Sequence, residues 1–278
     1  MLASQRQDLI LREVERAGGT RVSELVERLG VSDMTIRRDL DALAARGLVL
    51  KVHGGATSVR ARSTDEPGFS AKSSRQTREK AAIARTAARL VEPGASVALS
   101  AGTTTYAVAR ALRDVAGLTV VTNSPPVAEL LHDPARDDRT VVLTGGVRTP
   151  SDALVGPVAV ATLRSLHVDT LFLGVHGFDV RSGLTTPNLA EAETDRALVA
   201  CARRVVVVAD HSKWHGVGLS TIAALDEVDV LVSDAGLDPA ARDLLGQHVG
   251  RLLIADDDAA PSDACPPLTL PPSDAAHR

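Results

Sequence analysis

Short apolar runs alternate with amphipathic stretches through residues 76–254. Stretches at 106–113, 158–166 and 191–202 place apolar residues at helical spacing. The other runs are nearly continuous in β-branched residues and leucine, and we expect them to be strands: 97–99, 118–122, 140–143, 170–173, 205–209 and 228–232. Continuous apolar strands that alternate with helices are typical of a parallel sheet covered on both faces. The pattern predicts an α/β fold built on a doubly wound parallel sheet.

The first 56 residues follow a different pattern, that of short helices closed by a hairpin. Apolar residues at helical spacing predict three helices, at 2–16, 22–29 and 33–46. The run 48–53 and the glycines that follow it at 54–55 predict a strand entering a tight turn. Two helices joined by a short turn containing glycine, with a wing beside them, are typical of a winged helix-turn-helix domain.

The third predicted helix has the features of a DNA recognition helix. Its apolar residues recur at the i, i+4, i+7 spacing of a buried face, so the polar residues between them face outward. A helix N-terminus in the major groove favours phosphate, and hydroxyl and guanidinium groups can bond phosphates or base edges. The residues expected to contact DNA are Ser32, Thr35, Arg37 and Arg38, with Lys51 and His53 of the hairpin available to the DNA backbone.

The alternative for this segment is a plain helical hairpin with arginines on a solvated face. The whole chain carries a net charge of −4. Residues 33–62 nevertheless hold six Lys and Arg against three Asp, so a locally basic segment lies within an acidic protein. This contrast favours the DNA-binding interpretation.

Two strings in this segment resemble the DeoR family of bacterial transcriptional regulators. They are SDMTIRRDL, from Ser32 to Leu40, and VHGGA, from Val52 to Ala56, and their separation also fits. The resemblance implies that the recognition-helix contacts fall on Ser32, Thr35, Arg37 and Arg38. One small helix-turn-helix module binds weakly, and dimers read paired half-sites, so we also expect a homo-oligomer on double-stranded operator DNA.

Polar and glycine residues gather where five of the predicted strands end. In a parallel sheet these loops meet at one edge, which is where α/β folds bind ligands. The GTTT turn is the expected phosphate cradle, because its glycine lets the backbone approach and a helix follows it. The residues expected to bind an effector are Gly102, Thr103, Thr104, Thr105, Asn123, Ser124, Gly145, Gly146, Glu191 and Lys213.

Each of these residues also has an ordinary structural alternative. Threonine and glycine are common turn and cap residues. Asn123 can hold sugar hydroxyls or cap a helix, and Gly145 and Gly146 can admit a ligand or merely form a turn. Lys213 suits a phosphate counter-charge or a solvated surface, and Glu191 would stabilise the start of its helix whatever its function.

The same strand-end loops resemble the effector domain of the DeoR family. That domain is similar in fold to ribose-5-phosphate isomerase and glucosamine-6-phosphate deaminase, which implies a phosphorylated sugar or related metabolite as effector. The chain departs from the family pattern at three positions. Ser100 and His176 replace acidic residues, and Asp195 replaces a lysine. The lost acidic groups are ones that an isomerase would use as a general base.

Composition and missing motifs argue against several other kinds of site and partner. Of 278 residues, 44% are hydrophobic and 24% charged, as in globular proteins. The two cysteines lie far apart, no zinc-ligand spacing occurs, and nucleotide-binding glycine motifs and a nucleophile elbow are missing from the sequence. We therefore expect no metal, no cofactor, no disulfide framework, no membrane partner and a cytoplasmic protein, bound to the nucleoid when on DNA.

The sequence thus predicts a repressor of carbohydrate-metabolism genes rather than an enzyme. Its expected parts are a winged helix-turn-helix domain at 1–56, a linker at 57–75, an α/β effector-binding domain at 76–254 and a disordered tail at 255–278. The tail carries five prolines and five aspartates. The alternative is a sugar-phosphate isomerase or deaminase with an appended DNA-binding domain, because Asp179, Glu191 and Asp210 remain as carboxylates.

Overall fold

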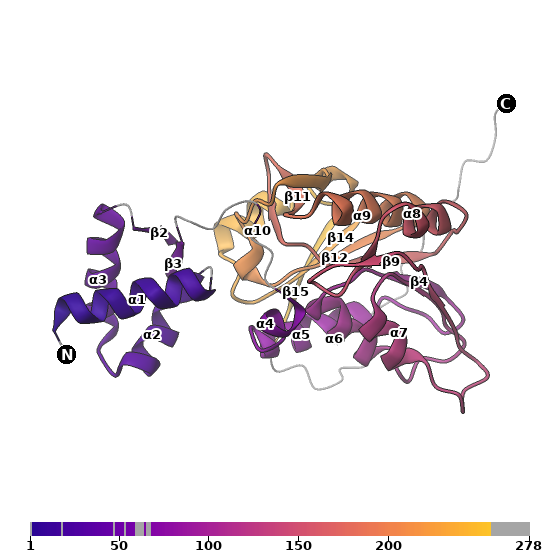
Figure 1. Ribbon diagram of the computed structural model, residues 1–278, viewed down its shortest axis with the longest axis horizontal. Coiled ribbons are helices and arrows are strands. Elements are labelled where there is room, and N and C mark those ends of the chain that lie inside the picture. The colour runs from indigo at the N-terminus through magenta and orange to yellow at the C-terminus, as the bar shows by residue number, and fades with distance from the viewer. Residues whose placement is uncertain are drawn as a thin grey trace.

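The protein consists of a small N-terminal helical lobe and a larger lobe in which helices cover both faces of a sheet (Figure 1). The computed structural model describes residues 2–17, 19–46, 48–52, 54–58, 64 and 68–256. In this described part of the chain, no helix is both long and apolar enough to cross a membrane. Most of the expected tail, residues 257–278, lies outside the described residues.

The N-terminal lobe has the predicted three helices and wing. Its elements are α1 (Ala3–Ala17), β1 (Gly19–Arg21), α2 (Val22–Leu29), α3 (Asp33–Ala45), β2 (Val49–Val52) and β3 (Gly55–Ser58). Ile36, Leu40 and Leu43 on α3 are at most 1% exposed and pack with Ile10 of α1 and Leu25 of α2. The predicted buried face of the third helix is therefore confirmed.

A third strand, β1, joins the wing and was not predicted. The sheet order is β1-β3-β2, and both pairings are antiparallel. Arg21 pairs with Gly55 across β1 and β3, and a Cβ atom at Gly55 would lie 2.2 Å from the Thr20 carbonyl oxygen. Glycine at this position lets the two backbones approach, so the VHGGA string also serves the fold.

The larger lobe contains a parallel sheet, as predicted, and the sheet has seven strands. Its order is β15-β14-β12-β9-β4-β5-β6. The strands are β4 (Ser96–Leu99), β5 (Thr119–Thr122), β6 (Thr140–Leu143), β9 (Thr170–Leu173), β12 (Val205–Val208), β14 (Val230–Asp234) and β15 (Arg251–Ala255). The chain builds from β4 outward to β6 and then crosses to the other side of β4 at β9, which makes the sheet doubly wound.

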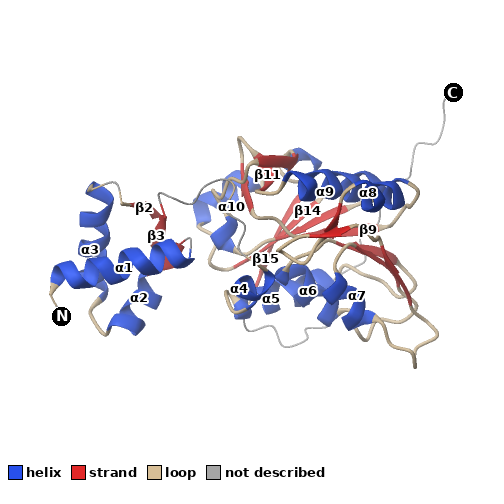
Figure 2. Ribbon diagram, in the orientation of Figure 1, coloured by secondary structure: helices blue, strands red, loops and turns tan. Residues whose placement is uncertain are grey.

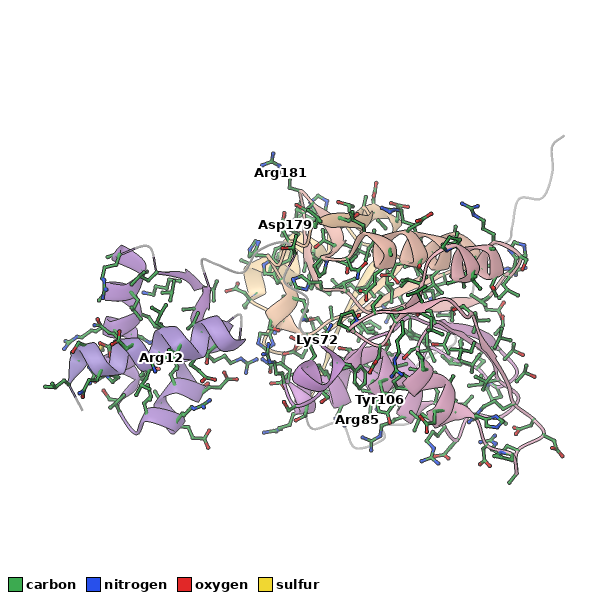
Figure 3. The ribbon with its side chains drawn as sticks, viewed as in Figure 1. Arg12, Lys72, Arg85, Tyr106, Asp179 and Arg181 are labelled. Atoms are coloured by element: carbon green, nitrogen blue, oxygen red, sulfur yellow. The ribbon has the colours of Figure 1, made fainter. Side chains whose placement is uncertain are left out.

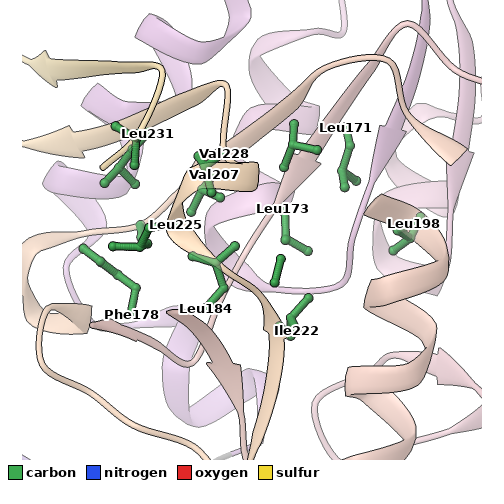
Figure 4. Close-up of a cluster of buried hydrophobic side chains, with 14 of the residues drawn as sticks. Leu171, Leu173, Phe178, Leu184, Leu198, Val207, Ile222, Leu225, Val228 and Leu231 are labelled. Carbon is green, nitrogen blue, oxygen red and sulfur yellow. The ribbon is translucent and has the colours of Figure 1, made fainter. Parts of the chain in front are cut away.

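Helices cover both faces of this sheet (Figure 2). One layer holds α4 (Phe69–Ser73), α5 (Thr77–Ala88), α6 (Thr103–Ala111) and α7 (Pro125–Leu131), and the other holds α8 (Pro157–Arg164), α9 (Leu189–Cys201) and α10 (Pro239–Leu245). Val206 and Val208 of β12 face the first layer, while Val205 and Val207 face the second. This alternation explains why the strands are apolar throughout. Figure 4 shows part of the hydrophobic core between the sheet and the second layer of helices, with Leu173 and Val207.

Several elements lie outside the sequence-based prediction. They are the helices α4, α5, α7 and α10, the strand β15, the short strands β7 (Val147–Arg148), β8 (Leu154–Val155), β10 (Gly177–Asp179), β11 (Gly183–Thr186) and β13 (Ser220–Ala223), and the 3₁₀ turns η1 (His211–Lys213) and η2 (Leu225–Glu227). The strands β10, β11 and β13 form a separate antiparallel sheet. In the N-terminal lobe β3 extends to Ser58, and α4 lies inside the segment expected to be a linker.

Candidate DNA-binding surface and effector site

The outward face of α3 carries the predicted DNA-contacting side chains. Ser32 caps the helix: its hydroxyl accepts a hydrogen bond from the Thr35 backbone N–H at 3.3 Å. Arg37 and Arg38 are exposed, and Met34 between them and the cap is 61% exposed. The helix therefore presents this face to solvent, as its spacing predicted. His53 lies outside the described residues.

Two of the basic residues on this surface are held by local ion pairs. Arg37 pairs with Asp33 one turn earlier, and Lys51 of β2 pairs with Asp41, each at 2.5 Å. Exposed pairs of this kind contribute about 0–1 kcal/mol. Exchanging such a carboxylate for a DNA phosphate therefore costs little, and the pairs pre-position both cations beside the helix.

The inner face of α3 contains an ion pair that was not predicted. Asp39 is 4% exposed and accepts hydrogen bonds from Arg6 Nε at 2.5 Å and Gln7 Nε2 at 3.1 Å, both from α1. Asp39 lies between the buried Ile36 and Leu40 in the sequence, and this position is the signal that could have predicted its burial. The pair fixes α1 against α3 and so orients the recognition surface.

The second candidate site lies at the carboxyl edge of the parallel sheet, where the chain changes direction between β4 and β9. Loops that follow these two strands diverge there, which is the usual ligand position in a doubly wound fold. Ser100, at the end of β4, accepts a hydrogen bond from the Gly174 backbone N–H at 3.0 Å. This hydrogen bond ties the two strand ends together, and Ser100 itself is 1% exposed.

The GTTT turn leads directly from β4 into α6. Gly102 has φ +148°, in the region that favours glycine, and the Thr105 hydroxyl donates to its carbonyl oxygen at 3.0 Å. Thr104 and Thr105 are buried, whereas Thr103, the first residue of the helix, is half-buried. Thr105 closes the turn, and Thr103 is the threonine best placed to meet a ligand at the helix N-terminus.

Asn123 connects the loops around this edge. Its Oδ1 accepts from the Ala101 backbone N–H at 2.9 Å, and its Nδ2 donates to the Leu154 carbonyl oxygen at 3.2 Å. Asn123 and Ser124 are at most 1% exposed, and the Ser124 Oγ atom has no hydrogen-bond partner among the described residues. The Asn123 side chain thus makes structural contacts, and Ser124 leaves an unused hydroxyl beside them.

Gly145 and Gly146 form the turn between β6 and β7. Both have positive φ, and a Cβ atom at Gly146 would lie 2.5 Å from the Val155 carbonyl oxygen. The structure thus gives Gly146 a role in the close packing of β7 on β8, while Gly145 faces the Val158 side chain of α8.

Glu191 lies in the first turn of α9, which is capped by the Asn188 side chain. Its carboxylate accepts hydrogen bonds from the hydroxyls of Thr149 at 2.7 Å, Ser151, and Thr186 at 3.4 Å. Glu191 thereby ties the segment between β7 and β8 to α9. Asp195 follows one turn later and is buried; burial, assisted by the charge of Glu191, raises the pKa of its carboxyl well above its ordinary value.

Lys213 belongs to a group of cations near the end of β12. The Lys80 amino group, 7% exposed, donates to the backbone carbonyls of Lys72 and Arg75 at 2.7 Å each. Burial lowers the pKa of Lys80 to about 8; Asp210 opposes this shift, whereas Lys213, Lys72 and Arg75 add to it. The charged groups of α4, α5 and η1 therefore lie close enough to act on one another. Lys72 is labelled in Figure 3.

Lys80 was not predicted as a site residue, although the sequence carries a signal for it. The chain has only four lysines, and three of them, Lys72, Lys80 and Lys213, meet in this group. Lys80 lies on a helix rather than in a strand-end loop, so the strand-end pattern does not predict its position at the site.

The three carboxylates considered as catalytic bases are all engaged by neighbouring groups. Asp179 lies 3.0 Å from His215 Nδ1, and Asp210 accepts from the Ser212 backbone N–H at 3.1 Å and from the Ser212 hydroxyl. Glu191 accepts from the hydroxyls described above. Within the described residues, no group of three or more His, Cys, Asp or Glu has a geometry that could hold a metal ion.

A separate charged cleft lies at the opposite, amino-terminal edge of the sheet. It is lined by Arg113, Asp114, Glu129, Leu130, His132, Asp133, Arg136 and Arg139. Guanidinium groups of Arg136 and Arg139 donate to the Arg113 carbonyl oxygen at 2.6 and 2.5 Å. These arginines thus satisfy the carbonyl groups that follow α6, which gives them a structural role.

Solved structures with a partly similar arrangement include ribose 5-phosphate isomerases. The isomerase A of Neisseria gonorrhoeae aligns over 49% of this chain and 52% of its own, with 19% identity and a TM-score of 0.35. The enzyme of Methanocaldococcus jannaschii gives 18% identity and the same TM-score over 49% of this chain and 53% of its own.

Relatives by sequence cover nearly the whole chain. The HTH-type transcriptional regulator YgbI of Escherichia coli is 37% identical over 260 residues, which is 93% of this chain and 100% of the relative. The HTH-type transcriptional regulator GlpR of Haloferax volcanii is 39% identical over 87% of this chain and 94% of its own. The glycerol-3-phosphate regulon repressor of E. coli is 33% identical over 89% and 97%.

Two family descriptions match the two lobes. Residues 6–62 match the DeoR-like helix-turn-helix domain, and residues 75–235 match the DeoR C terminal sensor domain. The resemblance of the SDMTIRRDL and VHGGA strings to the DeoR family is thereby confirmed. The chain belongs to the DeoR family of DNA-binding transcriptional regulators.

Proposed function

We propose that this protein is a repressor of carbohydrate-metabolism genes, released from or recruited to its operator by a phosphorylated sugar or related metabolite. The observation that carries the effector half of the proposal is the group of cations at Lys80 and Lys213. This group neighbours Asp210 beside the carboxyl edge of the sheet. A relative that is named a glycerol-3-phosphate regulon repressor supports the same chemical class of effector.

The effector's phosphate group suits this edge for a physical reason. A dianion is stabilised by ammonium groups, by backbone N–H groups at a helix start and by hydroxyl donors. Lys213 supplies the first, the turn at Gly102 the second, and Thr103 the third. The remaining proposed contacts to the effector are Thr104, Thr105, Asn123, Ser124, Gly145, Gly146 and Glu191.

On the DNA side, we assign the contacts to the exposed face and cap of α3 and to the wing. Ser32, Thr35 and Arg38 reach base edges or phosphates near the start of the helix, and Arg37 and Lys51 contact phosphate. Because one such module binds weakly, the protein acts as a homo-oligomer whose paired helices read two half-sites.

We assign no catalytic activity to the protein and place it in the cytoplasm, on the nucleoid when bound to DNA. The engagement of Asp179, Glu191 and Asp210 with neighbouring protein groups supports a binding role over a proton-transfer role. Effector binding shifts a two-state equilibrium only if the effector binds the two states with different affinity.

The effector site is tested by calorimetric titration of the full-length protein with glycerol 3-phosphate, ribose 5-phosphate and glucosamine 6-phosphate. We expect one of them to bind and Lys213→Gln to weaken that binding about 10- to 100-fold, the value of a charge-assisted contact to phosphate. Arg110→Gln, an exposed cation at the other end of α6, is the control and leaves affinity unchanged. Equal affinity in the wild type and Lys213→Gln would contradict the site, and turnover of any of the three would contradict the non-enzymatic assignment.

A further inference from the structure

One side chain of the DNA-binding lobe reaches into the sensor lobe. The Arg21 guanidinium contacts the His211 ring: its Nε lies 3.0 Å from His211 Nε2, and its Nη2 also contacts His211 Nε2. Its Nη1 atom is 3.6 Å from Glu79 Oε1. Arg21 is thus placed between a helix, α5, and the turn η1, two parts of the sensor lobe far apart in sequence.

Both partners of Arg21 are immediate neighbours of the charged groups at the candidate effector site. Glu79 precedes Lys80 on α5, and His211 lies between Asp210 and Lys213. A phosphate that attracts the ammonium groups of Lys80 and Lys213 therefore acts on the same two backbone segments that hold Arg21.

His211 is held in a fixed orientation. Its backbone N–H donates to Asp234 Oδ1 and its Nδ1 lies near Asp234 Oδ2, both at 2.7 Å. Burial alone would raise the pKa of Asp234, but hydrogen bonds from His211 and from the Gly236 backbone lower it below its ordinary value. A Cβ atom at Gly236 would lie 2.6 Å from His211 Nδ1, so the ring packs directly against this turn.

This arrangement makes the imidazole a specific acceptor for Arg21. With Nδ1–H donating to the Asp234 carboxylate, the lone pair of Nε2 is left to accept the Nε–H of the guanidinium. A displacement of η1 moves that lone pair and breaks the alignment. The contact therefore responds to the position of the turn that carries Lys213.

Within the DNA-binding lobe, the backbone of Arg21 is held at the start of α2. Its backbone N–H donates to Glu24 at 3.2 Å, and Glu24 also accepts from the Thr20 hydroxyl at 3.0 Å. Arg21 is the residue that precedes α2, and α2 packs against α3 through Leu25. Arg21 is therefore joined through the start of α2 to the core that α2 shares with α3.

Resting on the proposed function, we propose that Arg21 is the positioning residue that transmits effector binding at the sheet edge to the DNA-binding lobe, through His211 and Glu79. The contact is well suited to switching because it contributes little to the stability of the protein. The side chains of Arg21 and Glu79 are 36% and 23% exposed, and such pairs add little to stability. Its loss therefore uncouples the lobes without unfolding either one.

The test compares Arg21→Gln with Arg28→Gln in the full-length protein. Arg28 is on α2, is 60% exposed and pairs with Glu13 inside the same lobe, so its substitution makes the same charge change without touching the sensor lobe. Operator affinity is measured by fluorescence anisotropy with and without each of glycerol 3-phosphate, ribose 5-phosphate and glucosamine 6-phosphate. Calorimetry measures binding of the same compounds.

We expect the wild type and Arg28→Gln to show an effector response of about 5- to 150-fold in operator affinity. Arg21→Gln binds operator and effector but its response falls to less than about 2-fold, and Arg21→Gln combined with His211→Ala gives no further loss. A wild-type response in Arg21→Gln overturns the inference, as does loss of operator binding confined to that variant, which would make Arg21 a DNA contact. A wild type that binds operator but responds to none of the three compounds overturns the proposed effector class instead.

Discussion

Individual side chains in this protein are explained by what they face rather than by the motif in which they occur. Asn123 and Glu191 were predicted from their strand-end and helix-start positions, and both hold loops at the candidate site. Lys80 escaped prediction because it lies on a helix rather than in a strand-end loop. Arg21 escaped prediction because its partner is distant in sequence: His211 is 190 residues from Arg21. Sequence periodicity reports which face is buried, but not which remote group a polar side chain meets.

Asp195 is a residue whose burial leads to a stability prediction. Because its folded-state pKa is raised, the folded protein holds a proton that the unfolded chain releases as pH rises above the ordinary value. Its contribution to stability is therefore greatest at low pH and declines as pH rises. Asp195→Asn removes that penalty, so we expect the free energy of unfolding to increase by about 1–3 kcal/mol at pH 8 and by less at pH 4.

Urea unfolding at the two pH values checks this expectation. Asp243→Asn, an exposed aspartate on α10, is the control and changes stability little at either pH. A variant at position 195 that is equally destabilised at both values would contradict it and indicate that the carboxylate makes an essential contact.

Arg38 is the exposed residue of α3 that we expect to read the operator. Arg38→Ala is predicted to weaken binding to the specific site about 10- to 100-fold at constant salt. The matched change Arg12→Ala, on the exposed face of α1 (Figure 3), has a much smaller effect. Titrations at several salt concentrations distinguish a base contact from a phosphate contact, since loss of the latter lowers the salt slope by about 1. Unchanged operator affinity would remove Arg38 from the interface.

At the scale of elements, the sequence predicts what is long and regular. The strands β4, β9 and β12 are apolar on both faces, and the spacing of α3 defines its core face, so their periodicity is clear. Short elements depend on tertiary partners. The three residues of β1 form a strand because β3 lies beside them, and β15 is an edge strand bounded by Arg251 and Asp256.

The pairing of β1 with β3 gives a prediction at this scale. Gly55→Ala places a methyl group against the Thr20 carbonyl oxygen, so we expect the wing sheet to open and the N-terminal lobe to lose about 1–3 kcal/mol of stability. Gly54→Ala, at an adjacent position with φ +77° and open space, is the control for backbone strain alone. Thermal unfolding followed by circular dichroism compares both variants with the wild type, and a Gly55→Ala variant as stable as the wild type would show that the close approach is unimportant.

At the scale of the whole molecule, two lobes with different charge and architecture share one chain. The locally basic helix-turn-helix segment belongs to a protein of net charge −4, so global charge alone conceals its partner. Lys213, at the candidate effector site, and His211, which contacts Arg21, both belong to the turn η1. This proximity is the structural reason to expect effector binding and DNA binding to be linked.

The most direct test of this account is the affinity of the full-length protein for the DNA upstream of its own gene. Fluorescence anisotropy at fixed salt compares that DNA with a scrambled duplex, with and without the three phosphorylated compounds. We predict specific binding at least about 10³-fold tighter than to the scrambled duplex, and a change in that affinity with one compound. Equal affinity for both duplexes would contradict the assignment of α3 as an operator-reading helix.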